Sequence, residues 1–391
     1  MTSLMTAPAD VRSAVEDARA SGQFALDTEF VRERTYRARL CLVQLATRDA
    51  IWLIDAAGGA ELGPVVSLLS APEVEVVVHA GKQDLQIFHD AYGVVPRRVF
   101  DVQMAAGFAG LGGSLPYGRL VSELLGVGLV KGESYTDWCA RPLTPAQLSY
   151  AADDVRYLLP AADALKTRLS GLQRTAWVEE EMSALETEAS YVADADEAWR
   201  RVSGRGSLSG RQLAVLKEVA RWRELVAASR DLPRGWVVKD VTLVEIARRA
   251  PRSIDQLKGI RGLNPREAER SGPALLSAIE RGKQAEPIAP KKSPPRTLQQ
   301  RVRALAGLAD AILKARSDEA GVATEFVATR DELEAVLTDV LAGSLDGSGH
   351  RLLGGWRREL AGRSILALVE GRIAIAANDR PPYVREIELD R

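Results

Sequence analysis

Hydrophobic positions in the first hundred residues follow two different periods. Apolar residues recur at helical spacing between Asp10 and Gly22, which predicts a helix with Asp10 as its N-cap and Gly22 as its stop. The stretches 62–69 and 82–92 follow the same spacing. Short apolar runs predict strands at 24–30, 40–46, 50–54, 75–79 and 98–101. Strands that come first, with helices alternating afterwards, indicate a mixed sheet flanked by helices.

The strand signal disappears beyond Gly204, and the rest of the chain follows helical spacing. Short amphipathic helices are expected at 210–229, 242–249, 253–259 and 265–281. A linker with four prolines separates them from a second helical stretch that faintly repeats the first. The final residues are expected to be extended. These shifts predict an α/β domain at 1–204, helical modules at 205–286 and 297–375, a linker at 287–296 and a tail at 376–391.

Composition narrows the class of protein. The chain has 391 residues, of which 46% are hydrophobic and 27% charged, as in an ordinary soluble globular protein. We expect a cytoplasmic protein without a membrane association, because no apolar stretch is long enough to span a bilayer and the first residues lack the pattern of a signal peptide. Two cysteines, Cys41 and Cys139, exclude a disulfide scaffold, and with three histidines they leave no structural zinc site.

Charge is distributed unevenly along the chain. Residues 1–204 carry 19 Lys and Arg against 28 Asp and Glu, whereas residues 205–295 carry 19 against 10. Residues 296–391 are close to neutral, with 14 against 15. The acidic part suggests metal or acid chemistry, and the basic part suggests a polyanion such as nucleic acid. The alternative is that these charges only solvate the surface.

Two carboxylates stand in one apolar strand, at Asp27 and Glu29. Side chains two residues apart leave the same face of a strand, so both acids point the same way. Two like charges at a core strand are costly unless a cation lies between them, and a divalent metal ion prefers carboxylate oxygens. The alternative is a strand end where both acids face water or pair with Arg32 or Arg34.

Two further segments carry candidate chemistry. Asp84 is expected in the first turn of a helix, where the helix dipole alone favours an acid. His79, just before it, is most simply explained as a hydrogen-bonded side chain. Farther on, Tyr150 and Asp154 share a helix face at i, i+4, and geometry does not exclude Asp153 in place of Asp154. A phenol beside a metal-bound carboxylate can orient a water molecule, but a surface hydrogen bond would explain the pair equally well.

Together, these segments resemble the DEDD superfamily of 3′→5′ exonucleases, in its tyrosine-bearing DEDDy branch. The flanking sequence is similar to the ribonuclease D family. The similarity is carried by Asp27-Thr-Glu-Phe30, Val78-His-Ala-Gly81, Asp101-Val-Gln103, Asp137-Trp-Cys-Ala-Arg-Pro-Leu143 and Tyr150-Ala-Ala-Asp-Asp154. It covers essentially the whole chain, and the two helical modules resemble HRDC domains, the second more weakly.

The resemblance implies an RNase H-like exonuclease domain with a mixed five-stranded sheet, followed by two all-α HRDC-like domains. It implies two bound divalent metal ions, Mg²⁺ or Mn²⁺. Asp27 would bridge both ions, and Glu29 would bind the ion that holds the attacking water. Asp84 and Asp154 would complete the ligands, and Tyr150 would orient the water.

Other expected contacts rest on the same resemblance. Residues expected near the nucleotide are Phe30, His79, Gln103, Lys131 and Trp138, although Phe30 and Trp138 also suit a buried core position. In the first HRDC-like domain, phosphate contacts are expected from Arg248, Arg249, Lys258, Gly259, Arg261 and Gly262. Ser271 stands where many family members carry an aromatic residue, which puts a stacking role there in doubt. A packing role suits the near-neutral second module better than phosphate binding does.

The expected activity is a 3′→5′ exoribonuclease that releases 5′-mononucleotides by a two-metal mechanism. The expected partner is RNA, in particular tRNA precursors with 3′ extensions, and a monomer is favoured. One alternative is a DNA-directed exonuclease of the same superfamily. Others are a vestigial acidic cluster in a binding module, or an HRDC platform for nucleic acid or protein.

Overall fold

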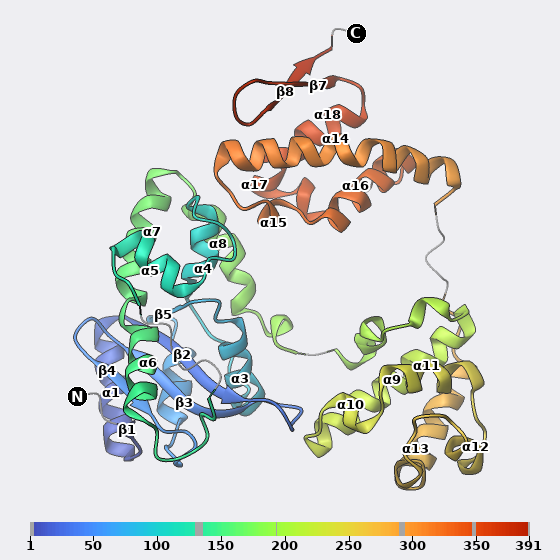
Figure 1. Cartoon of the computed structure of the whole chain (residues 1–391), viewed down its shortest axis with the longest axis horizontal. Coiled ribbons are helices and arrows are strands. Elements are labelled where there is room, and N and C mark those ends of the chain that lie inside the picture. Colours follow the sequence, from blue (N-terminus) through green and yellow to red (C-terminus); the bar gives the residue numbers. More distant parts are fainter. Residues whose placement is uncertain (1–3, 130–135, 193, 289–293, 346–348, 390–391) are drawn as a thin grey trace. The chain divides into compact units, whose positions relative to one another are not determined.

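The computed structural model describes residues 4–129, 136–192, 194–288, 294–345 and 349–389 (Figure 1). The chain forms two compact units that are not continuous in sequence. The first unit contains residues 1–29, 41–190 and 294–391. The second contains residues 30–40 and 191–293. The sequence-based boundary at residue 204 therefore differs from the structure, in which residues 191–204 group with the first helical module.

A mixed sheet forms the centre of the first unit, in the order β1-β4-β3-β2-β5-β6. Its parallel pairs are β2 with β5, β5 with β6 and β1 with β4, whereas β3 and β4 are antiparallel. The strands are β1 (Leu4–Met5), β2 (Gln23–Val31), β3 (Arg39–Ala46), β4 (Ile51–Ile54), β5 (Glu75–Val78) and β6 (Val99–Asp101). The mixed sheet is as expected. The five strands expected become six, because β1 is a two-residue edge strand too short to leave a sequence signal.

Helices follow the strands and cover the sheet (Figure 1). The first begins earlier than expected: Pro8 occupies the first helical turn and Ala7 the N-cap, so the prediction of Asp10 as N-cap is wrong. Its end at Gly22, which has a left-handed φ of 70°, is as expected. The helices are α1 (Pro8–Ser21), α2 (Gly63–Leu69), α3 (Lys82–Tyr92), α4 (Val102–Phe108), α5 (Tyr117–Leu125), α6 (Pro145–Arg156), α7 (Leu158–Gly171) and α8 (Thr175–Met182).

The second unit is helical apart from its loop at residues 30–40. Short 3-10 turns, η3 (Ala195–Arg201) and η4 (Arg205–Ser207), precede α9 (Gly210–Arg230), α10 (Arg234–Val237), α11 (Asp240–Arg249), α12 (Ile254–Lys258) and α13 (Pro265–Gln284). Trp199 and Val202 belong to the same hydrophobic core as the helices, which is why residues 191–204 join this unit. The loop is held by side chains of the helices: the hydroxyl of Tyr36 donates to Glu224 at 2.6 Å, and Asp231 accepts from the backbone N–H of Tyr36 at 3.0 Å.

The last hundred residues repeat the order of a long helix, a one-turn helix and a medium helix. They contain α14 (Arg296–Ala320), α15 (Thr324–Val327), α16 (Arg330–Ala342), η5 (Arg351–Leu353), α17 (Gly355–Arg357), the π-helical η6 (Arg358–Gly362), α18 (Arg363–Val369), β7 (Ile373–Ala377) and β8 (Val384–Glu388). The strands β7 and β8 form an antiparallel hairpin. The expectation of an extended tail agrees with β8, but the expectation that strand structure ends at Gly204 is wrong, because β7 and its pairing with β8 were not foreseen.

Aromatic packing joins residues 294–391 to the exonuclease part of the first unit. The ring of Phe108 stacks on Phe326 with centroids 5.0 Å apart, and Trp177 stacks on Trp356 at the same distance. Gly107 permits this approach, since an added Cβ would lie 2.1 Å from the Phe326 ring. One hydrophobic core therefore spans both segments. Among the described residues, no helix is long and apolar enough to cross a membrane.

Candidate active site

The carboxylates of interest come from three elements of the first unit. Asp27 and Glu29 lie on β2, Asp84 lies in the first turn of α3, and Asp154 lies in the last turn of α6. Burial and the neighbouring acids Asp84, Asp154 and Glu29 raise the pKa of Asp27 well above its ordinary value. Burial, then Asp154 and Asp84, raise the pKa of Glu29 to about 8. The structure thus brings the four acids within electrostatic reach of one another.

Asp84 is held in place by a residue that sequence analysis missed. The hydroxyl of Thr28, between the two acids of β2, donates to the Asp84 carboxylate. Burial raises the pKa of Asp84 to about 6, even though this hydrogen bond stabilises its charged form. Thr28 itself is 5% exposed. The only signal in the sequence that could have identified Thr28 is its place between the two acids of an apolar strand.

Asp101 organises the turn that leads into Asp84. Its carboxylate caps α4 by accepting from the N–H of Gln103 at 2.9 Å, and it also accepts from Gly81 at 3.0 Å, just before α3. The side chains of His79 and Gln103 both reach the carbonyl of Leu115, at 3.0 and 3.2 Å. Burial lowers the pKa of His79. His79 is thus hydrogen-bonded within the fold, in agreement with its simpler interpretation.

Helix α6 carries Tyr150 and Asp154, the last two of the expected site residues. The Tyr150 side chain hydrogen-bonds Asp154, which lowers the Asp154 pKa, but burial and the nearby Asp153 raise it, to about 7 overall. Asp153 instead pairs with Arg156 at 2.8 Å. Asp154, and not Asp153, is among the acids that raise the pKa values of Asp27 and Glu29 on β2.

Tyr117, a second tyrosine near the acids, was also missed. Its hydroxyl donates to the Asp153 carbonyl at 3.2 Å and accepts from the backbone N–H of Tyr157 at 3.3 Å. Burial raises its pKa, and Asp154 and Asp27 add to that shift. Its ring also lies 5.5 Å from that of His79. Nothing in its local sequence distinguishes it from an ordinary core tyrosine.

Trp138 is 2% exposed, as expected for a buried anchor, and its ring centroid lies 6.0 Å from that of Tyr150. Phe30 is partly buried, next to Glu29 on β2. Lys131 lies outside the described residues. Of the residues expected near a nucleotide, Trp138 thus packs beside Tyr150. His79 and Gln103 contact the same backbone carbonyl, that of Leu115.

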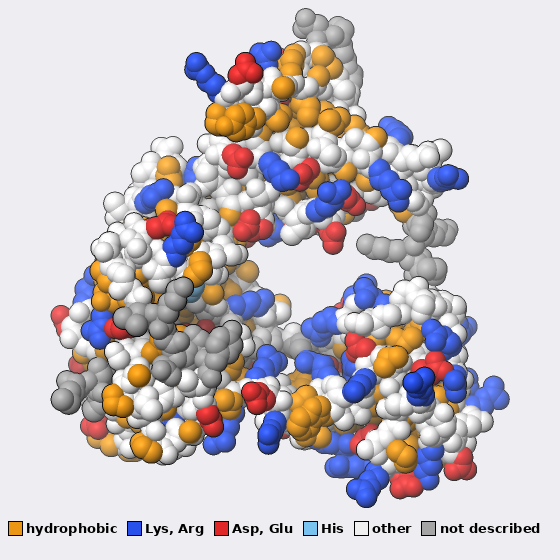
Figure 2. All heavy atoms as spheres, viewed as in Figure 1, with side chains coloured by type: hydrophobic (Ala, Val, Ile, Leu, Met, Phe, Trp, Pro, Cys, Tyr) orange, Lys and Arg blue, Asp and Glu red, His pale blue; other side chains and the backbone are white. Residues whose placement is uncertain are grey.

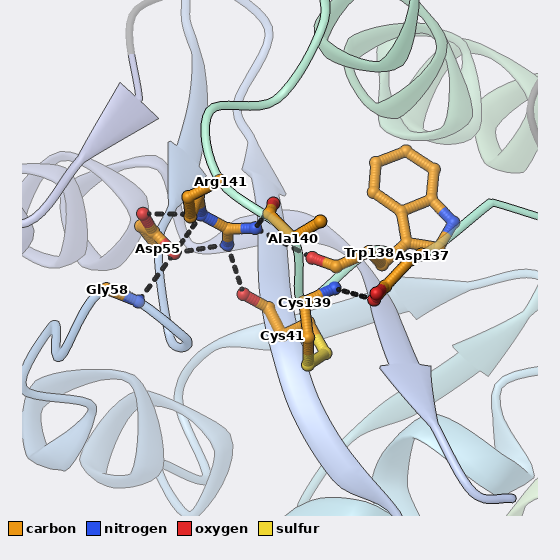
Figure 3. The surroundings of a disulfide bond; sticks show 8 residues. All are labelled: Cys41, Asp55, Gly58, Asp137, Trp138, Cys139, Ala140 and Arg141. Atoms are coloured by element: carbon orange, nitrogen blue, oxygen red, sulfur yellow. Dashed lines mark hydrogen bonds and ion pairs between the residues drawn. A yellow bond between two sulfur atoms is a disulfide. The ribbon is translucent and has the colours of Figure 1, made fainter.

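A disulfide and an ion pair fasten the segment that carries Trp138 (Figure 3). Cys139 is bonded to Cys41 of β3, 98 residues away in sequence. Arg141 pairs with Asp55, and hydrogen bonds from Arg141 and Gly58 hold the pKa of Asp55 below its ordinary value despite its burial. The Arg141 guanidinium also donates to the Cys41 carbonyl at 3.0 Å and the Trp138 carbonyl at 2.7 Å. Sequence analysis excluded a disulfide scaffold but did not foresee this single bridge.

The donor set suits a hard divalent cation, since four carboxylates converge without a Lys or Arg among the principal groups that shift their pKa values. Within the described ranges, however, no three His, Cys, Asp or Glu side chains are already grouped so that they could hold a metal ion. The chemistry of the residues therefore fits a metal, while their side chains are not closed around one.

In the structure, the residues expected to bind phosphate in the second unit fall into two groups: those that form an ion pair or cap a helix, and those that do neither. Arg248 and Arg249, in the last turn of α11, both pair with Glu245. Lys258 pairs with Glu269, and Gly259 caps α12. Arg261 and Gly262 follow in the turn before α13, and Arg261 forms no ion pair with another described residue.

Comparison with known proteins identifies the family. Residues 3–170 match the model of a 3'-5' exonuclease, and residues 212–279 match that of the HRDC domain. Ribonuclease D of Acidiphilium cryptum is 39% identical over 360 residues, which cover 91% of this chain and 90% of that protein. The chain belongs to the ribonuclease D family. It is therefore a nuclease, and the RNase D fold implies a dependence on divalent metal.

Other family members agree over similar lengths. Ribonuclease D of Gluconacetobacter diazotrophicus is 37% identical and covers 96% of this chain and 94% of its own length. The crystal structure of Escherichia coli RNase D, described as an exoribonuclease involved in structured RNA processing, matches with a TM-score of 0.81 and 31% identity. The match covers 95% of this chain and 99% of that chain. The expected family, the exonuclease fold and the presence of an HRDC domain are thereby confirmed.

The disulfide generates a testable prediction. A disulfide typically stabilises a protein by roughly 2–4 kcal/mol, and by more when it closes a loop as long as this one. Dithiothreitol should therefore lower the melting temperature of the oxidised protein to that of Cys139→Ser, and should leave the melting temperature of Cys139→Ser unchanged. Nuclease activity should fall in parallel, because the bridged segment packs Trp138 against Tyr150. Two free thiols in the denatured, unreduced protein would contradict the bridge.

Proposed function

We propose that this nuclease hydrolyses RNA from its 3′ end and releases 5′-mononucleotides, using two divalent metal ions held by Asp27, Glu29, Asp84 and Asp154. The observation that carries the proposal is that four carboxylates from three elements lie in one place, where burial and the neighbouring acids raise the pKa values of Asp27 and Glu29. A bound Mg²⁺ or Mn²⁺ pair would supply a metal-activated water and stabilise the leaving oxygen.

The chain's own residues supply position and proton handling. Thr28 orients the Asp84 carboxylate, and Tyr150 orients that of Asp154. Because Trp138 packs beside Tyr150, the phenol is held at the edge of the acidic cluster, where it can orient an attacking water. We assign Tyr150 this role and treat Phe30, His79 and Gln103 as candidates for contacts with the terminal nucleotide.

The substrate class follows from relatives. Proteins of this family carry the name ribonuclease D, and the E. coli structure is described as that of an enzyme of structured RNA processing. We propose RNA with a 3′ extension, in particular a tRNA precursor, as the substrate. A DNA-directed exonuclease is the rival, since the residue that would recognise a 2′-hydroxyl is not identified.

Asp27→Asn tests the metal ligands. We expect loss of nearly all activity on a 3′-extended tRNA, because the substitution keeps the side chain's shape and removes a carboxylate charge that would hold the metal ions. The metal-free variant should be as stable as the wild type or more so, since repulsion in the cluster is relieved. Asp153→Asn is the matched control, because Asp153 pairs with Arg156 and should be dispensable. Near wild-type turnover by Asp27→Asn at saturating Mg²⁺ would refute the assignment, and preference for a matched DNA oligomer would favour the rival substrate.

Tyr150→Phe tests the phenol separately from its ring. Orienting or acid–base groups contribute about 10²–10⁴-fold, and we expect a loss at the lower end of that range. The Mg²⁺ concentration for half-maximal rate should change little, because the tyrosine is not a ligand. Equal activity of Tyr150→Phe and the wild type in single-turnover assays would show that Tyr150 is a packing residue only.

A further inference from the structure

The loop that joins β2 to β3 continues the strand that carries two of the four acids. Residues 30–40 group with the second unit, whereas the preceding residues of β2 group with the first. The boundary therefore falls inside β2, at the peptide bond between Glu29 and Phe30. The described pairs of β2 with β5 end at residue 25. The far end of β2, with Asp27 and Glu29, thus depends on β3 and on the loop that joins the two strands.

Tyr36, in the middle of this loop, is held through its side chain. Its hydroxyl donates to Glu224 at 2.6 Å and accepts from the Arg234 guanidinium at 3.2 Å. That guanidinium also lies over the Tyr36 ring, 4.6 Å from the centroid, and donates to Glu224 at 2.6 Å. Glu224 is 3% exposed. Despite this burial, hydrogen bonds from Arg234 and Tyr36 hold the pKa of Glu224 below its ordinary value, so the phenol donates to a charged carboxylate.

Asp231 holds the backbone of the same loop. Its carboxylate accepts from the N–H groups of Tyr36 and Arg37, both at 3.0 Å. Asp231 is the C-cap of α9 and has a left-handed φ of 49°, a conformation that Asp and Asn adopt more readily than other side chains do. The end of α9 thus presents a carboxylate to the loop. We refer to the contacts of Tyr36 and Arg37 with Glu224, Asp231 and Arg234 as the loop anchor.

Charge opposes the docking of this loop on the helices. Arg32, Arg34 and Arg37 are exposed, and none of them forms an ion pair with another described residue. Residues 205–295 already carry 19 Lys and Arg against 10 Asp and Glu. In the space-filling view, Lys and Arg side chains outnumber carboxylates over the part of the molecule that contains α9 to α13 (Figure 2). Because like charges repel, the loop stays in place only if specific contacts offset the repulsion, and the loop anchor supplies two carboxylates for this purpose.

We propose that Tyr36 is a positioning residue for the nuclease: the loop anchor fixes the loop, and the loop in turn fixes the end of β2 and the position of the Glu29 carboxylate. The inference rests on the proposed function, because it takes Glu29 as a metal ligand. Tyr36 follows Glu29 by seven positions along a continuous strand and loop. A displacement of about 1 Å at a catalytic group can cost about 10²-fold in rate, so a contact this near along the chain is close enough to matter.

The experiment measures metal binding and turnover in the full chain. Tyr36→Ala removes both the ring and the hydroxyl from the loop anchor, and Tyr36→Phe removes the hydroxyl alone. In Tyr36→Ala, the calorimetric Kd for Mn²⁺ should rise and kcat on a 3′-extended RNA should fall, each by about tenfold or more, as is usual when a partner of a metal ligand is lost. KM for the RNA should change little, and Tyr36→Phe should shift both quantities in the same direction by less. Glu218→Gln, on the same helix and paired with Arg281, is the matched control and should leave them unchanged.

A pair of variants at Asp231 tests the backbone half of the loop anchor. Asp231→Asn keeps an acceptor oxygen for the loop, whereas Asp231→Gly keeps the left-handed backbone and removes the acceptor. The Asn variant should retain its Mn²⁺ affinity, and the Gly variant should lose affinity as Tyr36→Ala does. Trypsin, which cleaves after arginine, reports on the loop itself. Cleavage after Arg32, Arg34 or Arg37 should be faster in Tyr36→Ala and Asp231→Gly than in the wild type, because proteolysis follows the population of the opened segment.

Three results would overturn the proposal. They are unchanged Mn²⁺ affinity and kcat in the folded Tyr36→Ala protein, an equal loss in Glu218→Gln, and a rise in KM alone, which would assign the arginines of the loop to RNA binding instead. If Tyr36→Ala does not fold, Tyr36→Phe and the two Asp231 variants provide the same comparison. A wild type that binds Mn²⁺ but releases no nucleotides would refute the proposed function instead, and the Mn²⁺ affinities of the variants would still decide whether the loop anchor positions the acids.

Discussion

Mutual repulsion among four carboxylates is the constraint on which the rest of this structure depends. Burial raises the pKa values of Asp27, Glu29, Asp84 and Asp154, and neighbouring acids of the cluster raise those of Asp27 and Glu29 further. No local element could hold them, because β2, α3 and α6 each provide only part of the set. The fold must therefore bring the three elements together at a cost that a divalent cation would offset.

Neighbouring groups keep that cluster in position. Thr28 donates to one acid and Tyr150 to another, so two charged forms are partly stabilised before any ion binds. The Asp101 carboxylate fixes the turn that leads into α3. The disulfide of Cys139 fastens the segment whose Trp138 packs on Tyr150. These contacts explain why several polar residues without direct chemistry lie so close to the site.

Elements defined by local pattern were predictable, and those defined by distant partners were not. Helix α3 begins and ends where its periodicity placed it, and β2 matches its apolar run within one residue at each end. The bridge between Cys41 and Cys139 depends on segments 98 residues apart, which no local pattern reveals. The same holds for β1, a two-residue strand that is defined by its parallel pairing with β4.

The residues of the candidate site also fall into those that the sequence predicts and those that only the fold reveals. Its acids and Tyr150 were recognisable because their spacing along the chain resembles that of a family. Thr28 and Tyr117 act through neighbours that only the fold supplies, so their sequence context resembles that of ordinary core residues. In the second unit, Lys239, Thr242, Arg261 and Gly262 line one pocket, and the packing of α11, which no local charge pattern reveals, brings them together.

Proton release on metal binding tests the central claim most directly. With a pKa of about 8 for Glu29 and about 7 for Asp154, part of the metal-free cluster is protonated at pH 7, and a metal ion must displace those protons. Titrating the protein with Mn²⁺ calorimetrically, in buffers of different ionisation enthalpy, should show release of more than one proton per chain at pH 7 and of fewer at pH 9. Saturable binding without proton release at pH 7, or the same release from Asp27→Asn, would contradict the account.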